Sequence, residues 1–528
     1  MRIFNTTGPV RANEHYTLPP LERFDLDEIL FLIEQRKYFV LHAPRQVGKT
    51  SYLLALMEYL NSTGDYHCLY INVEAAQAAR EDVESAMQLI LGQIASRARD
   101  FLGDLFPQQI MSDTLEKYGI GALDEIITLW SIKSEKPLIL LIDEIDAFVG
   151  DTLISVLRQL RSGYDKRPTR FPQSIVLCGV RDVRDYRIHS SKEKNVITGG
   201  SAFNIKVESL RRGNFKQAEV EELYGQHTAE TGQEFTPNAL SLIWELTEGQ
   251  PWLVNALGYE VCFRTKEVRQ NRETITAEII HRAKEAIIHR RVTHLDQLTD
   301  KLQEERVRSV IELILSGQTQ AENLLKLDDV QYVEELGLIT THQQLRIANK
   351  IYQEVIPREL TYTTQLTITH QTQWYIASDG RIDVDKLMAE FQIFFRKNSE
   401  HWLERFDYKE AGPQLLLQAF LQRIINGGGR IEREYGLGRG RTDLLIIWPY
   451  GDQGAVQQVV IETKLRHGHL DRVVIPKGLA QTWAYMDRCD AENGHLVIFD
   501  RNKNRSWEEK IFRHVKNHND TEIIVWGM

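Results

Sequence analysis

Short apolar runs alternate with longer amphipathic stretches in the first third of the chain. The runs cover residues 38–43, 67–73, 137–143 and 174–179, and the stretches between them are long enough to form helices. Apolar runs of this length favour buried strands, so the alternation predicts an α/β fold with a parallel sheet covered by helices.

An all-helical pattern follows this sheet. Thr236-Pro237 supplies an N-cap residue with a first-turn proline, and Gly249 supplies a helix end. We interpret this part of the chain as a helical lid.

Two further helices and a hairpin are predicted beyond residue 300. One helix face is formed by Val307, Val310, Ile311 and Ile314, another by Val330, Val333 and Leu336, and two short apolar runs flank a polar turn within residues 338–347. Helices followed by a hairpin predict a winged helix.

The C-terminal part has the character of a separate α/β unit. The polar, threonine-rich residues 361–372 form a predicted boundary. Beyond them, Pro413 opens a strongly apolar helix that ends near Asn426, and the glycines at 427–429 predict a turn into new strands.

The composition of the chain indicates which classes of protein it does not resemble. The chain has 528 residues, enough for three or four domains, and a net charge of −10, so any binding of nucleic acid must be local. The longest apolar stretch, around Leu138 to Ile142, is far shorter than the roughly 18 residues of a membrane span. The N-terminus lacks the apolar core of a secretory signal, and the four cysteines are scattered. We therefore expect a cytoplasmic protein without a membrane partner.

A phosphate-binding loop is predicted after the first strand. The loop matches the usual motif except that alanine stands at the first glycine position. The loop and the residue after it are Ala43, Pro44, Arg45, Gln46, Val47, Gly48, Lys49, Thr50 and Ser51. Backbone N–H groups of such a loop surround phosphates, Lys49 reaches the β and γ oxygens, and Thr50 offers its hydroxyl to Mg²⁺. The loop predicts nucleotide binding.

Two acids follow an uninterrupted apolar strand about ninety residues later. Asp143 is placed to hold Mg²⁺ through water, and Glu144 to polarise an attacking water molecule. Together with the loop, this pair favours hydrolysis of the nucleotide over its storage.

These motifs resemble P-loop ATPases of the AAA-like and STAND group over roughly residues 13–360. The resemblance implies an ATP- and Mg²⁺-dependent switch built from an ATPase core, a helical lid and a winged helix. It also implies a polar sensor at Arg181 and a nucleotide contact at Pro251, within Gly249-Gln250-Pro251. Arg158 and Arg161 are interpreted as surface residues, so no arginine finger is assigned.

A second set of charged residues lies on predicted strands near the C-terminus. Asp443 opens one strand, and the apolar run 458–461 leads into Glu462-Thr463-Lys464. Side chains alternate along a strand, so Glu462 and Lys464 share a face, and Asp443 can lie beside them. Carboxylate oxygens suit Mg²⁺ or Mn²⁺, and Lys464 would orient the attacking water or stabilise the transition state. A second Glu-x-Lys, Glu508-Glu509-Lys510, lacks this context.

This C-terminal pattern resembles the PD-(D/E)XK nuclease superfamily over about residues 396–528, including the Gln481 to Tyr485 spacing of its exonuclease-like branch. The resemblance implies a restriction-endonuclease-like α/β domain with Gln481 at the active site. It implies metal ligands at Asp443, Glu462, Thr463 and an acid from the opening helix. Glu410 matches that acid best, with Glu404, Glu432 and Glu434 as competitors.

The predicted domains are an ATPase core (1–210), a lid (211–295), a winged helix (296–362), a linker (363–395) and a nuclease domain (396–528). We expect an ATP-controlled, Mg²⁺-dependent DNA nuclease, for which genome defence or mobile-element biology is an analogy at the level of fold. The competing hypothesis is a STAND-like signalling ATPase that binds DNA without cutting it. A homo-oligomer through the ATPase core is expected, and a protein activator is left open.

Overall fold

The computed structural model describes most of the chain. The described residues are 1–23, 25–180, 187–189, 196–198, 206–211, 213–265, 269, 273–290, 295, 300–316, 326–342, 345–360, 375–403, 412–425, 430–435, 442–451, 455–466, 469–500, 502 and 504–528. They divide between two compact units, Met1–Arg290 with Glu335–Gly337, and Arg291–Glu334 with Leu338–Met528. None of the described helices is both long enough and apolar enough to cross a membrane.

A five-stranded sheet forms the centre of the first unit. Its order is β4 (His67–Asn72), β5 (Leu138–Asp143), β6 (Ser174–Gly179), β3 (Tyr38–His42) and β9 (Lys206–Arg211), and every pairing is parallel. The predicted parallel α/β sheet is therefore confirmed. Its four predicted strands are β3 to β6, and β9 extends the sheet beyond β3.

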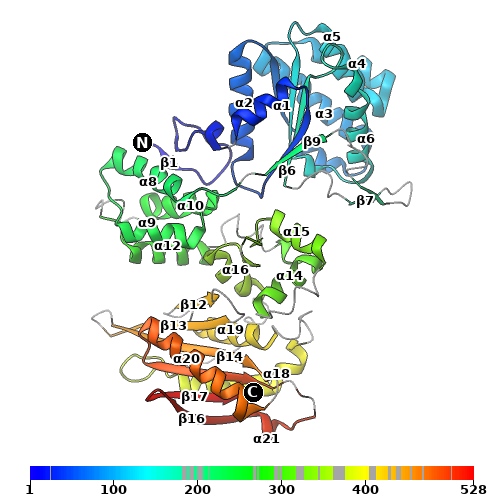
Figure 1. Cartoon of the computed structure of the whole chain (residues 1–528). Helices are drawn as coiled ribbons and strands as arrows, with labels where there is room; N and C mark the ends of the chain where they lie inside the picture. Colours follow the sequence, from blue (N-terminus) through cyan, green and yellow to red (C-terminus); the bar gives the residue numbers. More distant parts are fainter. Residues whose placement is uncertain are drawn as a thin grey trace. The chain divides into compact units, whose positions relative to one another are not determined.

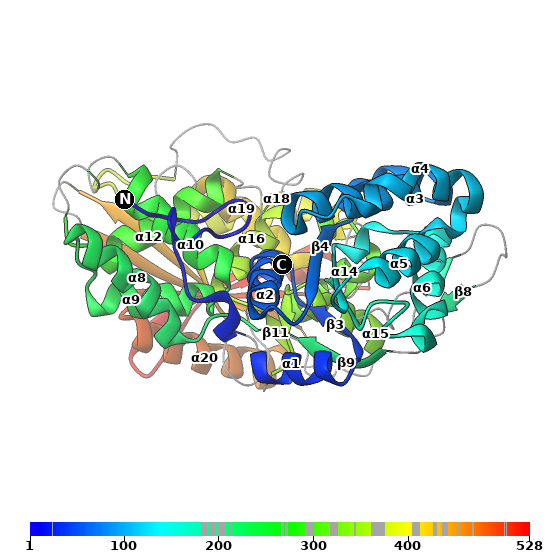
Figure 2. The same ribbon diagram turned by 90° about the horizontal axis from the view of Figure 1, so that it is seen from above.

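Helices cover both faces of this sheet because alternate residues of each strand point to opposite sides. Cys68 and Tyr70 of β4 pack toward α1 and α2, while Leu69 and Ile71 pack toward α3, α5 and α6. Figure 2 shows the two helical layers on either side of β3 and β4. The bounds are α1 (Leu26–Glu34), α2 (Lys49–Thr63), α3 (Val83–Arg97), α4 (Phe106–Tyr118), α5 (Ala122–Lys133) and α6 (Gly150–Ser162).

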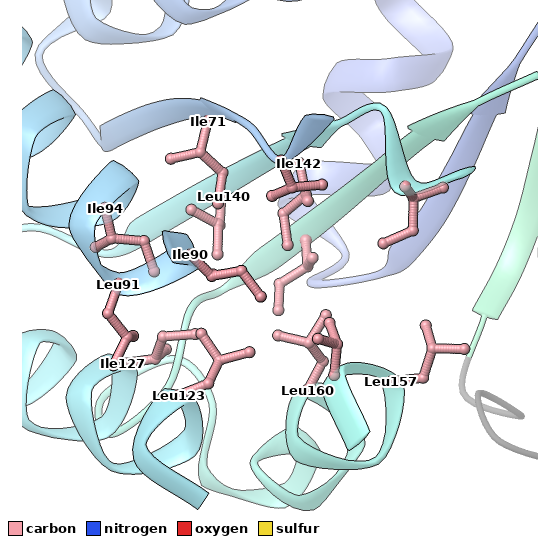
Figure 3. Close-up of a cluster of buried hydrophobic side chains, with 14 of the residues drawn as sticks. Ile71, Ile90, Leu91, Ile94, Leu123, Ile127, Leu140, Ile142, Leu157 and Leu160 are labelled. Atoms are coloured by element: carbon pink, nitrogen blue, oxygen red, sulfur yellow. The ribbon is translucent and has the colours of Figure 1, made fainter. Parts of the chain in front are cut away.

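The larger of these two cores is built almost entirely from aliphatic side chains. In Figure 3, strand residues face helix residues across it: Ile71, Leu140 and Ile142 lie opposite Ile90, Leu91, Ile94, Leu123, Ile127, Leu157 and Leu160. Burial of such a side chain contributes about 1.5–3 kcal/mol. This packing fixes the edge of the sheet at which the phosphate-binding loop begins.

The helical part predicted after the sheet is present. It contains α8 (Gln217–Thr231), α9 (Pro237–Thr247), α10 (Pro251–Tyr259) and α12 (Ala277–His289), and packs against the parallel pair β1 (Ile3–Phe4) and β2 (His15–Tyr16). Thr236 caps α9, its side chain accepting a hydrogen bond from the N–H of Ala239 at 3.2 Å. Gly249 follows the end of α9 with φ of 72°. A short hairpin, β7 (Arg187–His189) and β8 (Val196–Thr198), completes the strands described in this unit.

The second unit begins with helices and a small hairpin in the predicted order. The elements are α14 (Glu305–Ser316), α15 (Leu327–Glu335), β10 (Ile339–Thr340), β11 (Arg346–Ile347) and α16 (Lys350–Leu360). Val307, Val310 and Ile311 are buried, as their helical spacing predicts. The winged helix itself stays a prediction.

A six-stranded mixed sheet forms the rest of this unit. Its order is β12 (Arg430–Tyr435), β13 (Thr442–Tyr450), β14 (Ala455–Leu465), β15 (Asn493–Phe499), β17 (Thr521–Gly527) and β16 (Phe512–His518). The β14–β15 and β15–β17 pairings are parallel, and the others are antiparallel. In Figure 1, α20 (Ile475–Cys489) crosses one face, and α18 (Val384–Leu403) and α19 (Gly412–Ile425) lie on the other. The short α21 (Trp507–Lys510) precedes β16.

The structure differs from the predicted linker at residues 363–395. Helix α18 begins inside that stretch, and its Leu387, Met388 and Phe391 are fully buried against α19 and the sheet. These side chains follow helical spacing, a pattern typical of a core helix. The C-terminal domain therefore starts earlier than residue 396.

Candidate functional site

The first candidate site is the turn between β3 and α2. The strand ends at His42, the loop follows, and Lys49 is the first residue of the helix. Gly48 stands immediately before the helix with φ of 89°, a left-handed conformation that side chains disfavour. The glycine is therefore required for the sharp entry that brings the loop N–H groups to the helix N-terminus, where anions bind.

Lys49 is folded over its own loop. Its ammonium donates hydrogen bonds to the backbone carbonyls of Ala43 at 2.9 Å and Pro44 at 3.1 Å, and the side chain is buried. In the same loop, the side-chain carbonyl oxygen of Gln46 is buried without a hydrogen-bond partner. Phosphate oxygens form stronger hydrogen bonds with an ammonium than neutral carbonyls do, so this lysine is held at the position where a bound phosphate would take it over.

Asp143, at the end of β5, lies next to Thr50 in the fold. The carboxylate is fully buried and accepts hydrogen bonds from the Thr50 hydroxyl at 2.7 Å and the Tyr70 hydroxyl at 3.1 Å. Its other oxygen accepts the N–H of Glu144 at 2.9 Å. The predicted Mg²⁺ pair, Thr50 and Asp143, is therefore brought together, with the hard oxygen groups that Mg²⁺ prefers.

Tyr70 is the residue of this site that the sequence did not indicate. It comes from β4, the strand beside β5, and burial raises the pKa of its phenol, so the hydroxyl stays protonated and remains a donor. The sequence feature that could have indicated Tyr70 is its position. It is a polar residue two places before the end of a strand that neighbours β5 in a parallel sheet.

Glu144 adopts a left-handed conformation, with φ of 60° and ψ of 42°. Such a conformation is uncommon for a residue with a side chain and clusters at functional sites. Burial raises the pKa of its carboxyl, against the opposing charge of Lys49. Two residues on, the side chain of Asp146 accepts the N–H of Val180 and ties this acidic loop to the end of β6.

Comparison with family models identifies the family of the part of the chain that holds this site. A model of the AAA-like domain matches residues 32–356, more than half of the chain. The chain belongs to the AAA-like domain family. Membership implies binding of a nucleotide, usually with Mg²⁺, and Lys49, Thr50 and Asp143 are side chains of the type that such a ligand needs.

Similar solved structures have low identity to this chain. They include the Walker-type ATPase of Pyrococcus abyssi, with 14% identity, a TM-score of 0.46, and coverage of 67% of this chain and 99% of that one. Cdc6p from Pyrobaculum aerophilum has 13% identity and a TM-score of 0.35 over 72% of this chain and 95% of its own. The RuvB Holliday junction branch migration motor of Thermotoga maritima has 13% identity and a TM-score of 0.32 over 63% and 95%. No curated protein matches significantly.

The other residues predicted to contact the nucleotide lie in different surroundings. Ser51 accepts a hydrogen bond from the N–H of Val10 at 3.0 Å, so it holds the N-terminal segment. Pro251 is buried in the first turn of α10, and its contact with nucleotide stays a prediction. Arg181 lies outside the described residues. Arg158 and Arg161 are exposed on α6, in line with their interpretation as surface residues.

The Tyr70 hydroxyl gives a testable prediction for the AAA-like domain. We expect Tyr70→Phe to raise the Mg²⁺ concentration for half-maximal ATP turnover about 10-fold or more, because the loss of a hydrogen bond that orients a metal-holding group weakens metal affinity by about 10–100-fold. Tyr38→Phe is the matched control, since the buried Tyr38 hydroxyl of the same sheet donates to the Pro172 backbone carbonyl, at 3.2 Å, instead of to a carboxylate. Equal Mg²⁺ dependence of the two variants would contradict the assignment.

The second candidate site lies beyond the AAA-like domain, where β13 pairs with β14. Leu444 is opposite Ile461, and the next step of this antiparallel register puts Asp443 level with Glu462. On the other side, Asp443 pairs with Glu434 of β12. Directly opposed residues occupy the same face, so three acids form one row across three strands. For Asp443 and Glu434 only the backbone is described.

The face of the sheet on which this row lies is the one covered by α20. Val460 packs under α20, whereas Val459 and Ile461 pack toward α18 and α19. Glu462 and Lys464 continue the alternation of Val460. Thr463 has the opposite orientation, and its backbone carbonyl accepts a hydrogen bond from the Lys464 ammonium at 3.3 Å.

Glu462 is fully buried and forms an ion pair with Lys464. One of its carboxylate oxygens, Oε1, is paired with the Lys464 ammonium, whereas the other, Oε2, has no hydrogen-bond partner. The buried side-chain carbonyl oxygen of Gln481 on α20 has none either. Buried oxygens of this kind cost free energy unless a partner or an ion satisfies them. Glu462 lies on the sheet face that α20 covers and Gln481 lies on α20, so both unpartnered oxygens are candidate ligands for a cation.

The other predicted acids lie mostly outside the described side chains. Among the described residues no group of three or more His, Cys, Asp or Glu side chains is placed to hold a metal ion, but the side chains of Asp443 and Glu434 are not among them. Glu410 and Glu404 lie outside the described residues. Glu432 is on the same strand face as Glu434, two residues from the row.

Proposed function

We propose that this chain is an ATP-hydrolysing switch that controls a divalent-metal-dependent DNA nuclease formed by its C-terminal sheet. The observation that carries the nuclease part is the fully buried carboxylate of Glu462. Its Oε1 is paired with the Lys464 ammonium, its Oε2 has no hydrogen-bond partner, and the strand register puts Glu462 opposite Asp443. The AAA-like family supports the nucleotide part.

ATP hydrolysis would use the residues gathered around Asp143. Lys49 would leave the loop carbonyls for the β and γ phosphates, and Thr50 and Asp143 would hold Mg²⁺, which supplies charge neutralisation at the phosphates. Glu144, which directly follows Asp143, would take the proton of the attacking water. Burial raises the pKa of its carboxyl, which makes it a stronger proton acceptor than an exposed glutamate.

Phosphodiester hydrolysis would use the face beneath α20. Glu462, Asp443 and the Thr463 carbonyl are oxygen donors that fit Mg²⁺ or Mn²⁺, whose chemistry is to activate water and shield the scissile phosphate. Lys464 would stabilise charge developing on that phosphate. Gln481, with its unpartnered oxygen, would position the water or the metal. The acid supplied by the opening helix would be Glu410, and Glu434 is the alternative that the register favours.

DNA is the proposed substrate although the protein is acidic overall. From residue 430 to 477 there are eight Lys or Arg against six acids, and several of those acids are assigned to the metal. Local positive charge is what nucleic-acid binding requires. The proposal also includes a homo-oligomer formed through the ATPase core, a protein activator and a cytoplasmic location. A role in genome defence or mobile-element biology is an analogy at the level of fold.

The experiment that tests the function combines substrates and cofactors. Purified protein is incubated with plasmid, linear duplex and single-stranded DNA, each with and without ATP and Mg²⁺, and we expect Mg²⁺-dependent cleavage that ATP changes. Lys49→Ala should remove the effect of ATP, since the ammonium that reaches its phosphates is lost. If Lys49→Ala leaves the effect of ATP on cleavage unchanged, binding of ATP at this site does not control the nuclease. If the protein hydrolyses ATP and binds DNA but does not cleave it with any divalent metal, the result would favour the signalling ATPase that binds DNA without cutting it.

A further inference from the structure

Two arginines converge on one buried carboxylate beside the proposed nuclease site. Arg466 donates to the Asp500 carboxylate at 2.9 Å and Arg505 donates to the same oxygen at 2.5 Å. The Asp500 side chain is 5% exposed, whereas those of Arg466 and Arg505 are 17% and 33% exposed. The two guanidinium groups and backbone hydrogen bonding hold the pKa of Asp500 below its usual value, despite burial. The carboxylate therefore stays ionised and offsets only one of the two positive charges.

Arg466 is the third member of an alternating series on one strand. It follows β14 directly, and its N–H extends the parallel ladder by donating to the Phe499 carbonyl at 2.9 Å. The positions of Glu462, Lys464 and Arg466 alternate with Leu465, which packs toward α18 and α19. At about 3.3 Å per residue, Arg466 lies roughly 7 Å beyond Lys464 along the strand.

The hydrogen bonding of Arg466 is incomplete. Its Nε atom is buried and has no hydrogen-bond partner. A buried N–H donor without an acceptor costs free energy, and a guanidinium fork binds phosphate through two adjacent N–H groups. A structural ion pair with Asp500 explains one edge of the guanidinium. It explains neither the unused Nε donor nor the second arginine.

We propose that Arg466 and Arg505 form a phosphate-binding subsite for the DNA strand that passes Glu462 and Lys464. Asp500 fixes the two guanidinium groups, the net charge of the three side chains is +1, and the ligand is a backbone phosphodiester next to the scissile one. Phosphate contacts of this type position a strand without reading its sequence. The inference rests on the proposed DNA substrate, but it does not require that the DNA is cut.

The test measures how DNA binding depends on salt. Fluorescence anisotropy of a labelled oligonucleotide with the full chain, in EDTA so that cleavage does not proceed, gives the slope of log Kd against log salt. We expect Arg466→Gln to weaken binding and to lower the magnitude of this slope by about one, the contribution of one phosphate contact. Arg505→Gln, at the more exposed arginine, should act in the same direction.

Arg513→Gln is the matched control. Arg513 also forms an ion pair with an aspartate, Asp385, at 2.7 Å, and stacks on Trp526 of the α18 side of the same sheet. The control should leave the slope unchanged. Slopes that are unchanged in Arg466→Gln and Arg505→Gln, or a wild-type chain that binds no DNA, would overturn the subsite. A lowered slope in a chain that never cleaves DNA would support the subsite and refute the nuclease alone.

Discussion

Replacing Glu144 with Gln is expected to stop ATP hydrolysis while ATP remains bound. The side chain of this residue is half-buried at the end of β5, burial raises its pKa, and its N–H donates to the Asp143 carboxylate. Gln has nearly the same shape and leaves that backbone hydrogen bond intact, but it cannot accept the proton of water. General bases contribute about 10²–10⁴-fold to a rate, so we expect turnover to fall by that factor.

The measurement compares turnover with binding in three proteins. Steady-state phosphate release gives the rate, and equilibrium binding of a fluorescent ATP analogue gives the affinity. Lys49→Ala should lose both, because the lysine contacts the phosphates themselves. Glu116→Gln on the exposed surface of α4 is the control and should change neither. Turnover that stays within about threefold of wild type in Glu144→Gln would remove Glu144 from the reaction, since a general base contributes far more than that.

The nucleotide site was predictable from sequence to the extent that it is local. Lys49 and Thr50 are adjacent in the loop, and Asp143 is marked by the apolar strand before it, so each appears as a pattern within a few residues. Tyr70 is 73 residues from the carboxylate it contacts, and only the parallel pairing of β4 with β5 brings them together. No local pattern in the sequence encodes that pairing.

In the C-terminal site, too, the local features could be predicted from the sequence and the long-range contacts could not. The alternation that gives Glu462 and Lys464 a common face is a property of any strand, so it follows from sequence. The contact of Arg466 with Asp500 does not, because β15 returns beside β14 only after α20. The predicted linker was wrong for a related reason: α18 is a core helix only because α19 and the sheet cover its apolar face.

Glu462→Gln is expected to abolish Mg²⁺-dependent DNA cleavage while leaving ATP turnover intact. The substitution removes the negative charge that would hold the metal at the scissile phosphate. A bound metal ion stabilises the transition state by several kcal/mol, and each ~1.36 kcal/mol is a factor of ten, so we expect a loss of about 10²–10³-fold or more. Asp443→Asn should have the same effect, because the register places it level with Glu462.

The controls separate lost chemistry from lost folding. Glu508→Gln changes the first residue of the other Glu-x-Lys in the chain, which lies on the exposed surface at α21, and should cleave normally. Mn²⁺ should raise the melting temperature of the wild-type chain but not that of Glu462→Gln, since a ligand stabilises only the protein that binds it. The same assay on Glu410→Gln and Glu434→Gln identifies the remaining acid. Cleavage that survives in folded Glu462→Gln and Asp443→Asn would leave the C-terminal sheet as a DNA-binding domain and the ATPase as the protein's enzymatic activity.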